Sequence, residues 1–267
     1  MFISHLSSKI QFIVSQVFLY LGMNFLVLGN SYSQEVFVRY IANAGVQISD
    51  GTRDVFIDVL FDDFYEQFEY PDEQILSLIF NNQDPFTNPR IHLFTHIHKD
   101  HYNEEYALKE AQNSNSKLIV VPGFFSNTDS SVIVSNIFEF ESDELFKIDE
   151  NLSIHSYKTT HLNEDFKDIL NISYLVDIRG KKILHIGDSE VSLENFSSIP
   201  DQEVDLVIIP FFVLNQETIE VLNQKFSNPI IAPIHTSSNT KERVIEFINS
   251  NESLIDMNTT MELIQLK

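Results

Sequence analysis

The sequence predicts an α/β fold in which two β-sheets pack face to face and helices cover their outer surfaces. Strand-like apolar segments occur in both halves of the 267-residue chain, and helix-like segments follow them. A chain of this length can bury the core of one large domain. No repeat, linker or low-complexity block divides residues 34–267, so we expect a single domain there.

The first half of this domain is expected to open with a β-hairpin, because Asp50-Gly51 is a turn signal between two apolar segments. The strands expected in this half are Glu35–Ile41, Gly45–Ser49, Asp54–Leu60, Ile91–Thr95 and Lys117–Val121. A short helix is expected over Asp72–Phe80. A second helix should run from Glu104 to near Gln112, with Asn103 as its N-cap.

The second half repeats this alternation with more strands. Its expected strands are Asp143–Asp149, Leu152–Tyr157, Asn171–Ile178, Lys181–Ile186, Val204–Pro210 and Ile230–Ile234. Arg179-Gly180 should form the turn between the third and fourth of these. Helices are expected over Gln216–Phe226 and Thr240–Asn249.

Four metal-binding side chains follow the apolar run Ile91–Thr95 directly, in the segment His96-Ile97-His98-Lys99-Asp100-His101. A strand end followed by a tight loop can direct His96 and His98 at one point, and Asp100 and His101 at a neighbouring one. Nitrogen and carboxylate ligands suit zinc, and less exclusively iron or manganese. A histidine-rich surface loop is the alternative, but such clusters seldom coincide with a strand end. The segment therefore predicts a site for two metal ions.

Three further polar residues stand at the ends of apolar strands, which is where layered α/β folds place function. His161 follows the strand that begins at Leu152, Asp188 follows Lys182–Gly187, and His235 follows Ile230–Ile234. Each alone would be read as a loop or core residue. Together with the first cluster they supply the remaining ligands for a pair of ions.

At these motifs, and at Asp58 after Val55-Phe56-Ile57, the sequence resembles the metallo-β-lactamase-fold hydrolase superfamily over residues 35 to 240. The resemblance implies a four-layer αββα sandwich of the metallo-β-lactamase type. It implies that His96, His98 and His161 hold one metal ion and that Asp100, His101 and His235 hold the other. Asp188 would bridge the two ions, and Asp58 would support the ligand loop without binding metal.

Within that superfamily, a bridging carboxylate at the position of Asp188 is similar to the pattern of the glyoxalase II, ribonuclease Z, phosphodiesterase and lactonase branches. The best-known zinc β-lactamases instead carry a cysteine among their ligands, and this chain has no cysteine. Tyr40–Val46 and Gly187-Asp188 look most like lactonase-type and uncharacterised bacterial hydrolases. The resemblance implies a hydrolase with two divalent metal ions, Zn(2+) first and Mn or Fe as alternatives. A hydroxide bound by both ions would cleave a small ester, lactone or thioester, with Asp100 as the catalytic proton relay.

Two alternatives remain open: a phosphodiesterase or nuclease that uses the same site, and a non-catalytic or redox di-iron member that only binds metal. Residues that flank the ligands are candidates for substrate contact, with a structural role as the alternative for each: Tyr102, Asn163, Phe212, Thr236 and Ser237. The aromatic-rich segment Phe61–Pro89 is expected to supply mainly local core, with an aromatic wall beside a small substrate as the alternative. His185 is expected to be a satisfied core histidine.

Residues 1–33 have a different composition from the rest. They contain one charged side chain, Lys9, then an apolar stretch from Ile10 to Gly29, and Ser31 and Ser33 fit a small-x-small cleavage signal. This pattern predicts a signal peptide and a secreted or periplasmic protein, with an uncleaved membrane anchor as the alternative. Ser15, Gln16 and Asn24 interrupt the stretch and weaken the anchor reading.

The composition disfavours nucleic acid as a partner. Without residues 1–33 the chain has 16 basic and 39 acidic residues, a net charge of −23. Such a surface repels phosphate backbones, so a small-molecule substrate is expected. A membrane partner is expected only if the N-terminal segment is uncleaved. The absence of cysteine excludes disulfides and a lipid-modified cysteine.

Overall fold

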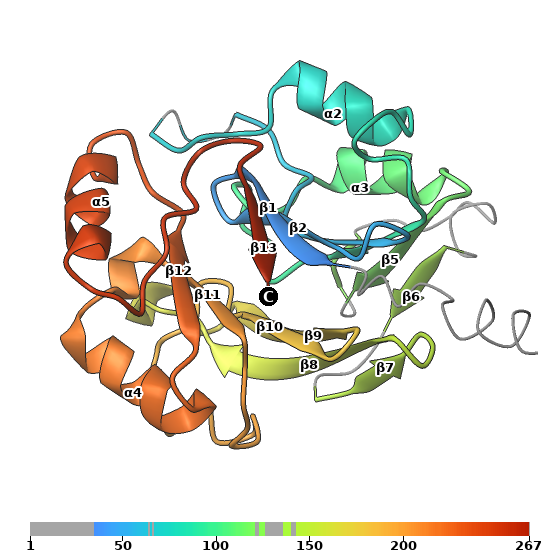
Figure 1. Cartoon of the computed structure of the whole chain (residues 1–267). Coiled ribbons are helices and arrows are strands. Elements are labelled where there is room, and N and C mark those ends of the chain that lie inside the picture. The colour runs from blue at the N-terminus through green and yellow to red at the C-terminus, as the bar shows by residue number, and fades with distance from the viewer. Residues whose placement is uncertain are drawn as a thin grey trace, which may run out of the picture. The chain divides into compact units, whose positions relative to one another are not determined.

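Two mixed β-sheets lie at the centre of the computed structural model, which describes residues 35–63, 65, 67–120, 123–125, 136–139 and 143–266 (Figure 1). The first sheet has the strand order β13-β1-β2-β3-β4-β5-β6, and the second has the order β12-β11-β10-β9-β8-β7. Both sheets belong to one compact unit that spans Glu35–Lys267.

The first sheet combines antiparallel and parallel pairing. β1 pairs antiparallel with β13 and β2, and β2 with β3, whereas β3 through β6 are parallel. Its strands are β1 (Val36–Ala42), β2 (Gly45–Ser49), β3 (Asp54–Ile57), β4 (Arg90–Leu93), β5 (Ser116–Val120), β6 (Ile137–Glu139) and β13 (Leu263–Leu266). The helices that accompany it are α2 (Glu73–Phe80) and α3 (Glu104–Ala111).

The second sheet has an antiparallel part, β7 to β10, and a parallel part, β10 to β12. Its strands are β7 (Leu145–Lys147), β8 (Leu152–Thr160), β9 (Leu170–Ile178), β10 (Lys181–His185), β11 (Leu206–Pro210) and β12 (Ile230–Ile234). The helical segments in this half are η1 (Glu164–Phe166), η2 (Phe211–Val213), α4 (Gln216–Phe226) and α5 (Lys241–Asn249).

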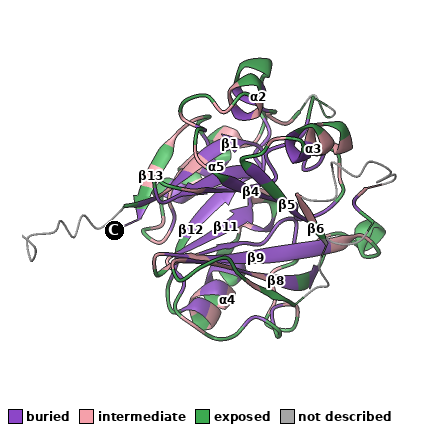
Figure 2. Ribbon diagram, turned by 90° about the vertical axis from the view of Figure 1, so that its right-hand side faces the viewer, coloured by how far each residue is buried: buried purple, intermediate pink, exposed green. Residues whose placement is uncertain are grey.

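The helices cover the outer faces of the two sheets, which gives the four-layer αββα arrangement expected from the sequence (Figure 1). One core cluster joins both sheets and the two helices of the first half, and it includes Val55 on β3, Ile172 on β9, Ile79 on α2 and Ala107 on α3. A second cluster lies under α4 and α5 and includes Leu222 and Val244. The inner strands of both sheets are buried, the edge strands β7 and β13 are partly exposed, and each α-helix keeps one exposed side (Figure 2), as amphipathic helices on a sheet must.

Most element boundaries agree with the sequence-based expectation, and β2, α4 and β12 have the expected bounds. The Asn103 side chain accepts a hydrogen bond from the Tyr106 amide and so caps α3. Two expected strands end early. β3 stops at Ile57 because Asp58 adopts a left-handed conformation with φ of 50°. β4 stops at Leu93 because Thr95 instead bonds Asp58 through its amide and Ile172 through its carbonyl.

Two strands were not expected, β6 and β13, and the expected strand over Asp143–Asp149 forms only as the three-residue β7. The end of the expected strand at Val121 lies outside the described residues, as do Phe64 and the whole of residues 1–33. The prediction of a signal peptide or anchor therefore stays a prediction. Within the described part of the chain, no helix has the length and apolar character needed to cross a membrane.

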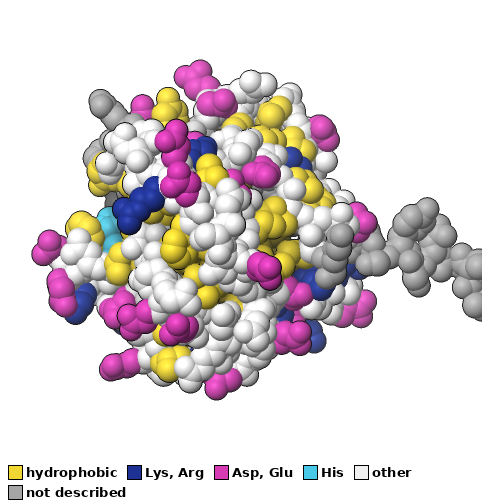
Figure 3. All heavy atoms as spheres, turned by 60° about the vertical axis from the view of Figure 1, so that its left-hand side comes forward, with side chains coloured by type: hydrophobic (Ala, Val, Ile, Leu, Met, Phe, Trp, Pro, Cys, Tyr) yellow, Lys and Arg dark blue, Asp and Glu magenta, His cyan; other side chains and the backbone are white. Residues whose placement is uncertain are grey.

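Acidic side chains dominate the charge of the surface. On the face drawn in Figure 3 they are spread over the whole area, and Lys and Arg side chains are fewer. This agrees with a formal net charge of −22 for the full chain.

Candidate metal centre

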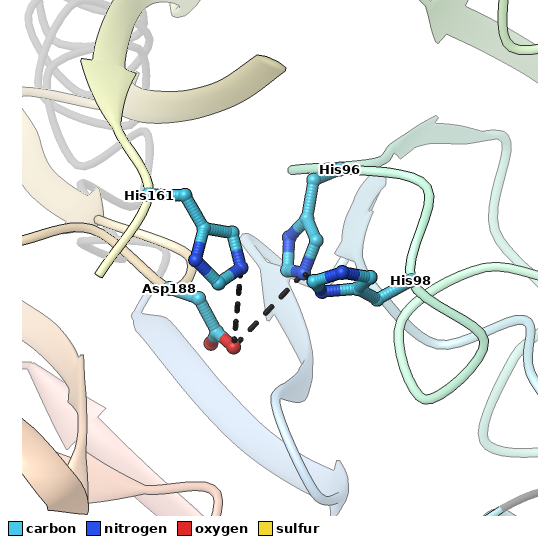
Figure 4. Close-up of side chains that lie close together, drawn as sticks. All are labelled: His96, His98, His161 and Asp188. Atoms are coloured by element: carbon cyan, nitrogen blue, oxygen red, sulfur yellow. Dashed lines mark hydrogen bonds and ion pairs between the residues drawn. The ribbon is translucent and has the colours of Figure 1, made fainter. Parts of the chain in front are cut away.

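Four of the expected ligands meet at the ends of strands from both sheets. His96 and His98 lie on the loop after β4, His161 follows β8, and Asp188 follows β10 (Figure 4). Each offers one ligand atom, and these atoms all lie within 4.8 Å of one another. The closest pair is His96 Nε2 and His98 Nδ1, at 2.9 Å.

The other three expected ligands, Asp100, His101 and His235, form a second group with the same spacing limit of 4.8 Å. His101 Nε2 lies 3.1 Å from His235 Nε2, and His235 Nε2 lies 3.3 Å from Asp100 Oδ2. All three residues are buried, and His235 stands directly after β12.

The Asp188 carboxylate lies between the two groups. Its Oδ2 is 3.9 Å from His161 Nε2 and 4.0 Å from His96 Nε2 in the first group. Its Oδ1 is 3.5 Å from His101 Nε2, and its Oδ2 is 3.7 Å from His235 Nε2, in the second. One carboxylate is therefore placed to serve both groups.

The donor atoms fit divalent metal ions in number, chemistry and spacing. Ligand atoms roughly 2.0–2.2 Å from a tetrahedral ion stand about 3.3–3.6 Å apart, and the separations quoted above run from 2.9 to 4.0 Å. The buried His161 Nε2 has no hydrogen-bond partner among the described residues, which a bound ion would supply. The set of five imidazoles and two carboxylates suits zinc, iron or manganese.

Hydrogen bonds on the far side of three histidines leave the inward nitrogen free to bind metal. His96 Nδ1 lies 3.0 Å from Thr95 Oγ1, and His161 Nδ1 lies 3.3 Å from the Leu162 carbonyl. His101 Nδ1 lies 2.8 Å from Asp58 Oδ2. Such outer partners fix the tautomer and the ring orientation of a ligating histidine.

Asp58 contacts the loop that carries four of the candidate ligands. It is fully buried below the ligand loop, and its Oδ1 accepts a hydrogen bond of 2.7 Å from the Thr95 amide. Its Oδ2 contacts both the Thr95 hydroxyl and His101. Asp58 thus fixes the position of the start of the loop and the orientation of the His101 ring.

The ionisable groups of the site shift one another's pKa values. Burial lowers the pKa of His96 well below its usual value, and it lowers the pKa of His98. Burial alone would also lower the pKa of His101, but the carboxylates of Asp188 and Asp58 raise it well above its usual value. Burial would raise the pKa of Asp188, but the charges of His101 and His235 lower it well below. The His101 imidazole and the Asp188 carboxylate therefore stabilise each other's charged forms.

The turn that carries Asp188 is tightly packed. Gly187 has φ of 59°, and a Cβ atom there would lie 2.5 Å from Asn171 Oδ1 and 2.7 Å from Thr95 Cβ. The Asp188 amide donates to Asn171 Oδ1 at 3.2 Å. His185 closes the turn from below, since its Nδ1 accepts from the Gly187 amide while its Nε2 donates to the Ala44 carbonyl. This confirms His185 as a satisfied core histidine.

Comparison with known proteins identifies the family of this chain. A family model described as a β-lactamase superfamily domain matches residues 37–235. The chain belongs to this superfamily. The match confirms the superfamily expected from the sequence, and the fold is the expected metallo-β-lactamase type. No curated protein is similar enough in sequence to be matched.

Solved structures of other proteins share the fold of this chain at low sequence identity. Igni18, a metallo hydrolase from the archaeon Ignicoccus hospitalis, is 14% identical with a TM-score of 0.59, over 87% of this chain and 99% of that one. YhfI from Bacillus subtilis, a metallo-β-lactamase-fold protein, is 12% identical with a TM-score of 0.58, over 87% and 99%. CmlA from Streptomyces venezuelae, a diiron β-hydroxylase, is 14% identical with a TM-score of 0.54, over 88% and 54%.

Three phenylalanine rings border the candidate ligands of this superfamily member, and we call them the aromatic rim: Phe68, Phe166 and Phe212. Phe68 and Phe212 meet His235 edge to face, with centroid distances of 4.6 and 5.1 Å. Phe166 contacts His98 at 4.8 Å and His161 at 5.5 Å. Phe166 and Phe212 are 40% and 39% exposed, so their rings also face solvent.

The aromatic segment after β3 therefore has two roles. Phe61 and Phe86 are buried in the core, as expected for most of this segment, whereas Phe68 belongs to the rim. Sequence reasoning named Phe212 as a contact candidate but missed Phe68 and Phe166. Nothing in the sequence beyond an aromatic residue in a loop marks either of them.

The other candidates for substrate contact have partners inside the protein. The Tyr102 hydroxyl donates to the Phe124 carbonyl at 2.7 Å, and Thr236 donates to Asn258 at 3.2 Å. Ser237 bonds Thr240. Asn163 is exposed, and its side chain accepts from the Asp165 amide. These hydrogen bonds favour a structural role for Tyr102, Thr236 and Ser237.

One polar neighbour of the second ligand group was also missed. Asn43 is fully buried, and its Nδ2 donates to the Asp100 carbonyl at 3.0 Å. The Asn43 carbonyl in turn accepts from the His235 amide at 2.9 Å. Asn43 thus ties two ligand-bearing loops together. Its left-handed conformation, with φ of 49° between β1 and β2, is one that asparagine adopts more readily than most residues.

Proposed function

We propose that this member of the superfamily is a hydrolase that uses two divalent metal ions, zinc foremost, to cleave a small ester, lactone or thioester. The observation that carries the proposal is the position of Asp188, whose carboxylate faces both ligand groups at 3.5–4.0 Å. A single ion would need only one of the groups. Six buried or half-buried donors around the shared Asp188 carboxylate suit a pair of ions.

When bound, such a pair of ions acidifies a water molecule and polarises a substrate oxygen. The protein contributes the geometry: Asp58, Thr95 and Asn43 hold the ligand loops rigid through buried hydrogen bonds. Asp100 is the proposed proton acceptor. Burial would raise its pKa, but the hydrogen bond from His235 and the charge of His101 lower it, so Asp100 stays ionised near neutral pH.

The surroundings of the site favour an uncharged substrate over a phosphodiester or a nucleic acid. The aromatic rim offers apolar surface beside the ligands. Lys167, which follows the rim residue Phe166, is paired with Glu164, and Lys241 is paired with Glu69, which follows the rim residue Phe68. The acidic surface adds repulsion against phosphate chains (Figure 3).

The test is a panel of esters, lactones and thioesters, assayed beside bis-p-nitrophenyl phosphate and single-stranded RNA at low and moderate salt. Hydrolysis of at least one carbonyl substrate is expected to exceed phosphodiester hydrolysis by a wide margin. Asp188→Ala should lose more activity than His235→Ala, because the carboxylate serves both groups. His155→Ala is the matched control, since His155 pairs with Tyr157 on β8.

Three outcomes would sink the proposal. Preferential RNA cleavage that weakens as salt rises would favour the nuclease alternative. Stoichiometric iron with oxidase activity and no hydrolysis would favour a redox member. Equal losses in Asp188→Ala and His235→Ala, with unchanged metal content, would remove the shared role of Asp188.

We also propose that residues 1–33 direct the protein out of the cytoplasm, as a cleaved signal peptide or, alternatively, as an anchor. The composition of this segment supports the proposal, with one charged side chain and a long apolar stretch.

A further inference from the structure

A groove opens beside the metal centre, between η2, the start of α4, and α5. Its volume is about 680 Å³, within the range of small-molecule sites. Its apolar walls are formed by Phe211, Phe212, Leu214, Val244 and Phe247. We call this cavity the α5 groove.

Phe212 connects the α5 groove to the metal centre. Its ring lines the groove and also meets the His235 ring at a centroid distance of 5.1 Å. Thr240 lines the groove as well, and its hydroxyl bonds Ser237, two residues after His235. A molecule whose reacting atom lies at the ligand cluster therefore needs to pass only one ring to reach the groove.

The charge of the groove suits an uncharged occupant. Arg243 and Glu246 both line it, so the charged side chains at the groove offset each other. Among the described residues neither side chain has an ion-pair partner within 4.0 Å, which leaves both to solvent. The apolar walls then provide the surface that a ligand can bury.

We propose that the α5 groove binds the apolar acyl or alkyl part of the substrate, so that the enzyme prefers medium-length chains over acetyl-sized groups. The inference rests on the proposed hydrolase function and narrows its substrate class. Each methylene that enters the groove should improve kcat/KM by up to about fourfold, the factor that corresponds to burying one CH₂. The gain should stop when the chain outgrows the groove.

The first test compares esters with acyl chains of two to twelve carbons. Gln216→Trp places a large side chain at an exposed groove position, at the first residue of α4. Glu220→Trp is the matched control one turn further along the same helix, outside the groove. The preference for a ten-carbon over a two-carbon chain should fall at least tenfold in Gln216→Trp and persist in Glu220→Trp. A flat chain-length profile in active wild-type enzyme would overturn the inference.

The second test measures binding without hydrolysis. The chain has no tryptophan, so each variant carries a single indole reporter. In the purified full chain stripped of metal, 1-octanol should shift the emission of Gln216→Trp to the blue, and 1-butanol should do so far less. Glu220→Trp should show no shift. Equal responses in the two variants would contradict the inference, as would a Gln216→Trp emission that is already blue-shifted and insensitive to octanol.

The two tests separate this inference from the proposed function. If no chain length is hydrolysed with any metal, the hydrolase proposal fails, and the octanol titration still decides whether the groove binds apolar chains. If hydrolysis occurs without dependence on chain length or on Gln216→Trp, the hydrolase proposal stands and the groove has no part in substrate binding.

Discussion

Gly187→Ala should damage both the stability of the fold and the binding of metal, for reasons that can be worked out separately. The left-handed conformation of residue 187, with φ of 59°, costs an alanine roughly 1–2 kcal/mol. The new Cβ would also lie 2.5 Å from Asn171 Oδ1 and 2.7 Å from Thr95 Cβ. Overpacking of this kind costs about 1–3 kcal/mol. The expected total is about 2–5 kcal/mol.

Gly180→Ala is the matched control, because Gly180 has φ of 81° and no atom within 4 Å of its hypothetical Cβ. It should lose only the conformational part, about 1–2 kcal/mol. The assay is urea unfolding of both variants without metal, followed by metal titration. Since Asn171 also accepts from the Asp188 amide, metal affinity should fall in Gly187→Ala and not in Gly180→Ala. Equal unfolding free energies and equal metal affinities in the two variants would refute this reasoning.

Three further predictions concern the ligands and the N-terminus. Asp58→Asn should lower metal affinity about 10–100-fold in a calorimetric titration, because the amide replaces the carboxylate that pairs with His101 Nδ1. An unchanged metal affinity would show that Asp58 does not support the site. The carboxylates of Asp188 and Asp58 raise the pKa of His101, so a metal ion must displace a proton to bind this histidine, and metal affinity should rise with pH until the raised pKa is passed. A calorimetric titration in two buffers should detect the released proton. A metal affinity that does not depend on pH would contradict this prediction. Mass spectrometry of the mature protein should place its N-terminus near Gln34, outside the cytoplasm; an intact chain in the membrane fraction would favour the anchor.

The parts of the site that could be predicted from sequence are those encoded locally. His96, His98, Asp100 and His101 stand within six residues after an apolar strand, so both their chemistry and their position are readable from the chain. Asp188 could be named from its place at a strand end. Its position between the two ligand groups depends on how β10 lies relative to β4 and β12, which no local pattern contains.

The rim shows where local patterns fail. Phe68, Phe166 and Phe212 come from three segments that are far apart in sequence, and the packing of the two sheets brings them to one site. Tyr102 illustrates the opposite case. It follows a ligand directly, but its ring packs against Phe94 and its hydroxyl bonds Phe124. Adjacency to a ligand in sequence does not determine the direction of a side chain.

The two strands that were missed, β6 and β13, and the strand that was shortened to three residues, β7, all lie at sheet edges. β13 pairs only with β1, and its Leu263 is 46% exposed, so the segment lacks the buried apolar run that marks a strand. β7 is the edge of the second sheet, and its Leu145 is 57% exposed. Pairing at an edge is decided by the neighbouring strand, which is why β7 ends after three residues.

The central claim, a site for two metal ions, is tested most directly by the metal content of purified protein, measured by elemental mass spectrometry and expressed per chain. The account predicts close to two transition metal ions per chain in the wild type. It predicts loss of tight binding in His96→Ala/His98→Ala, with circular dichroism showing that the variant is folded. Stoichiometric metal retained by that double variant, or a single ion in the fully loaded wild type, would contradict it.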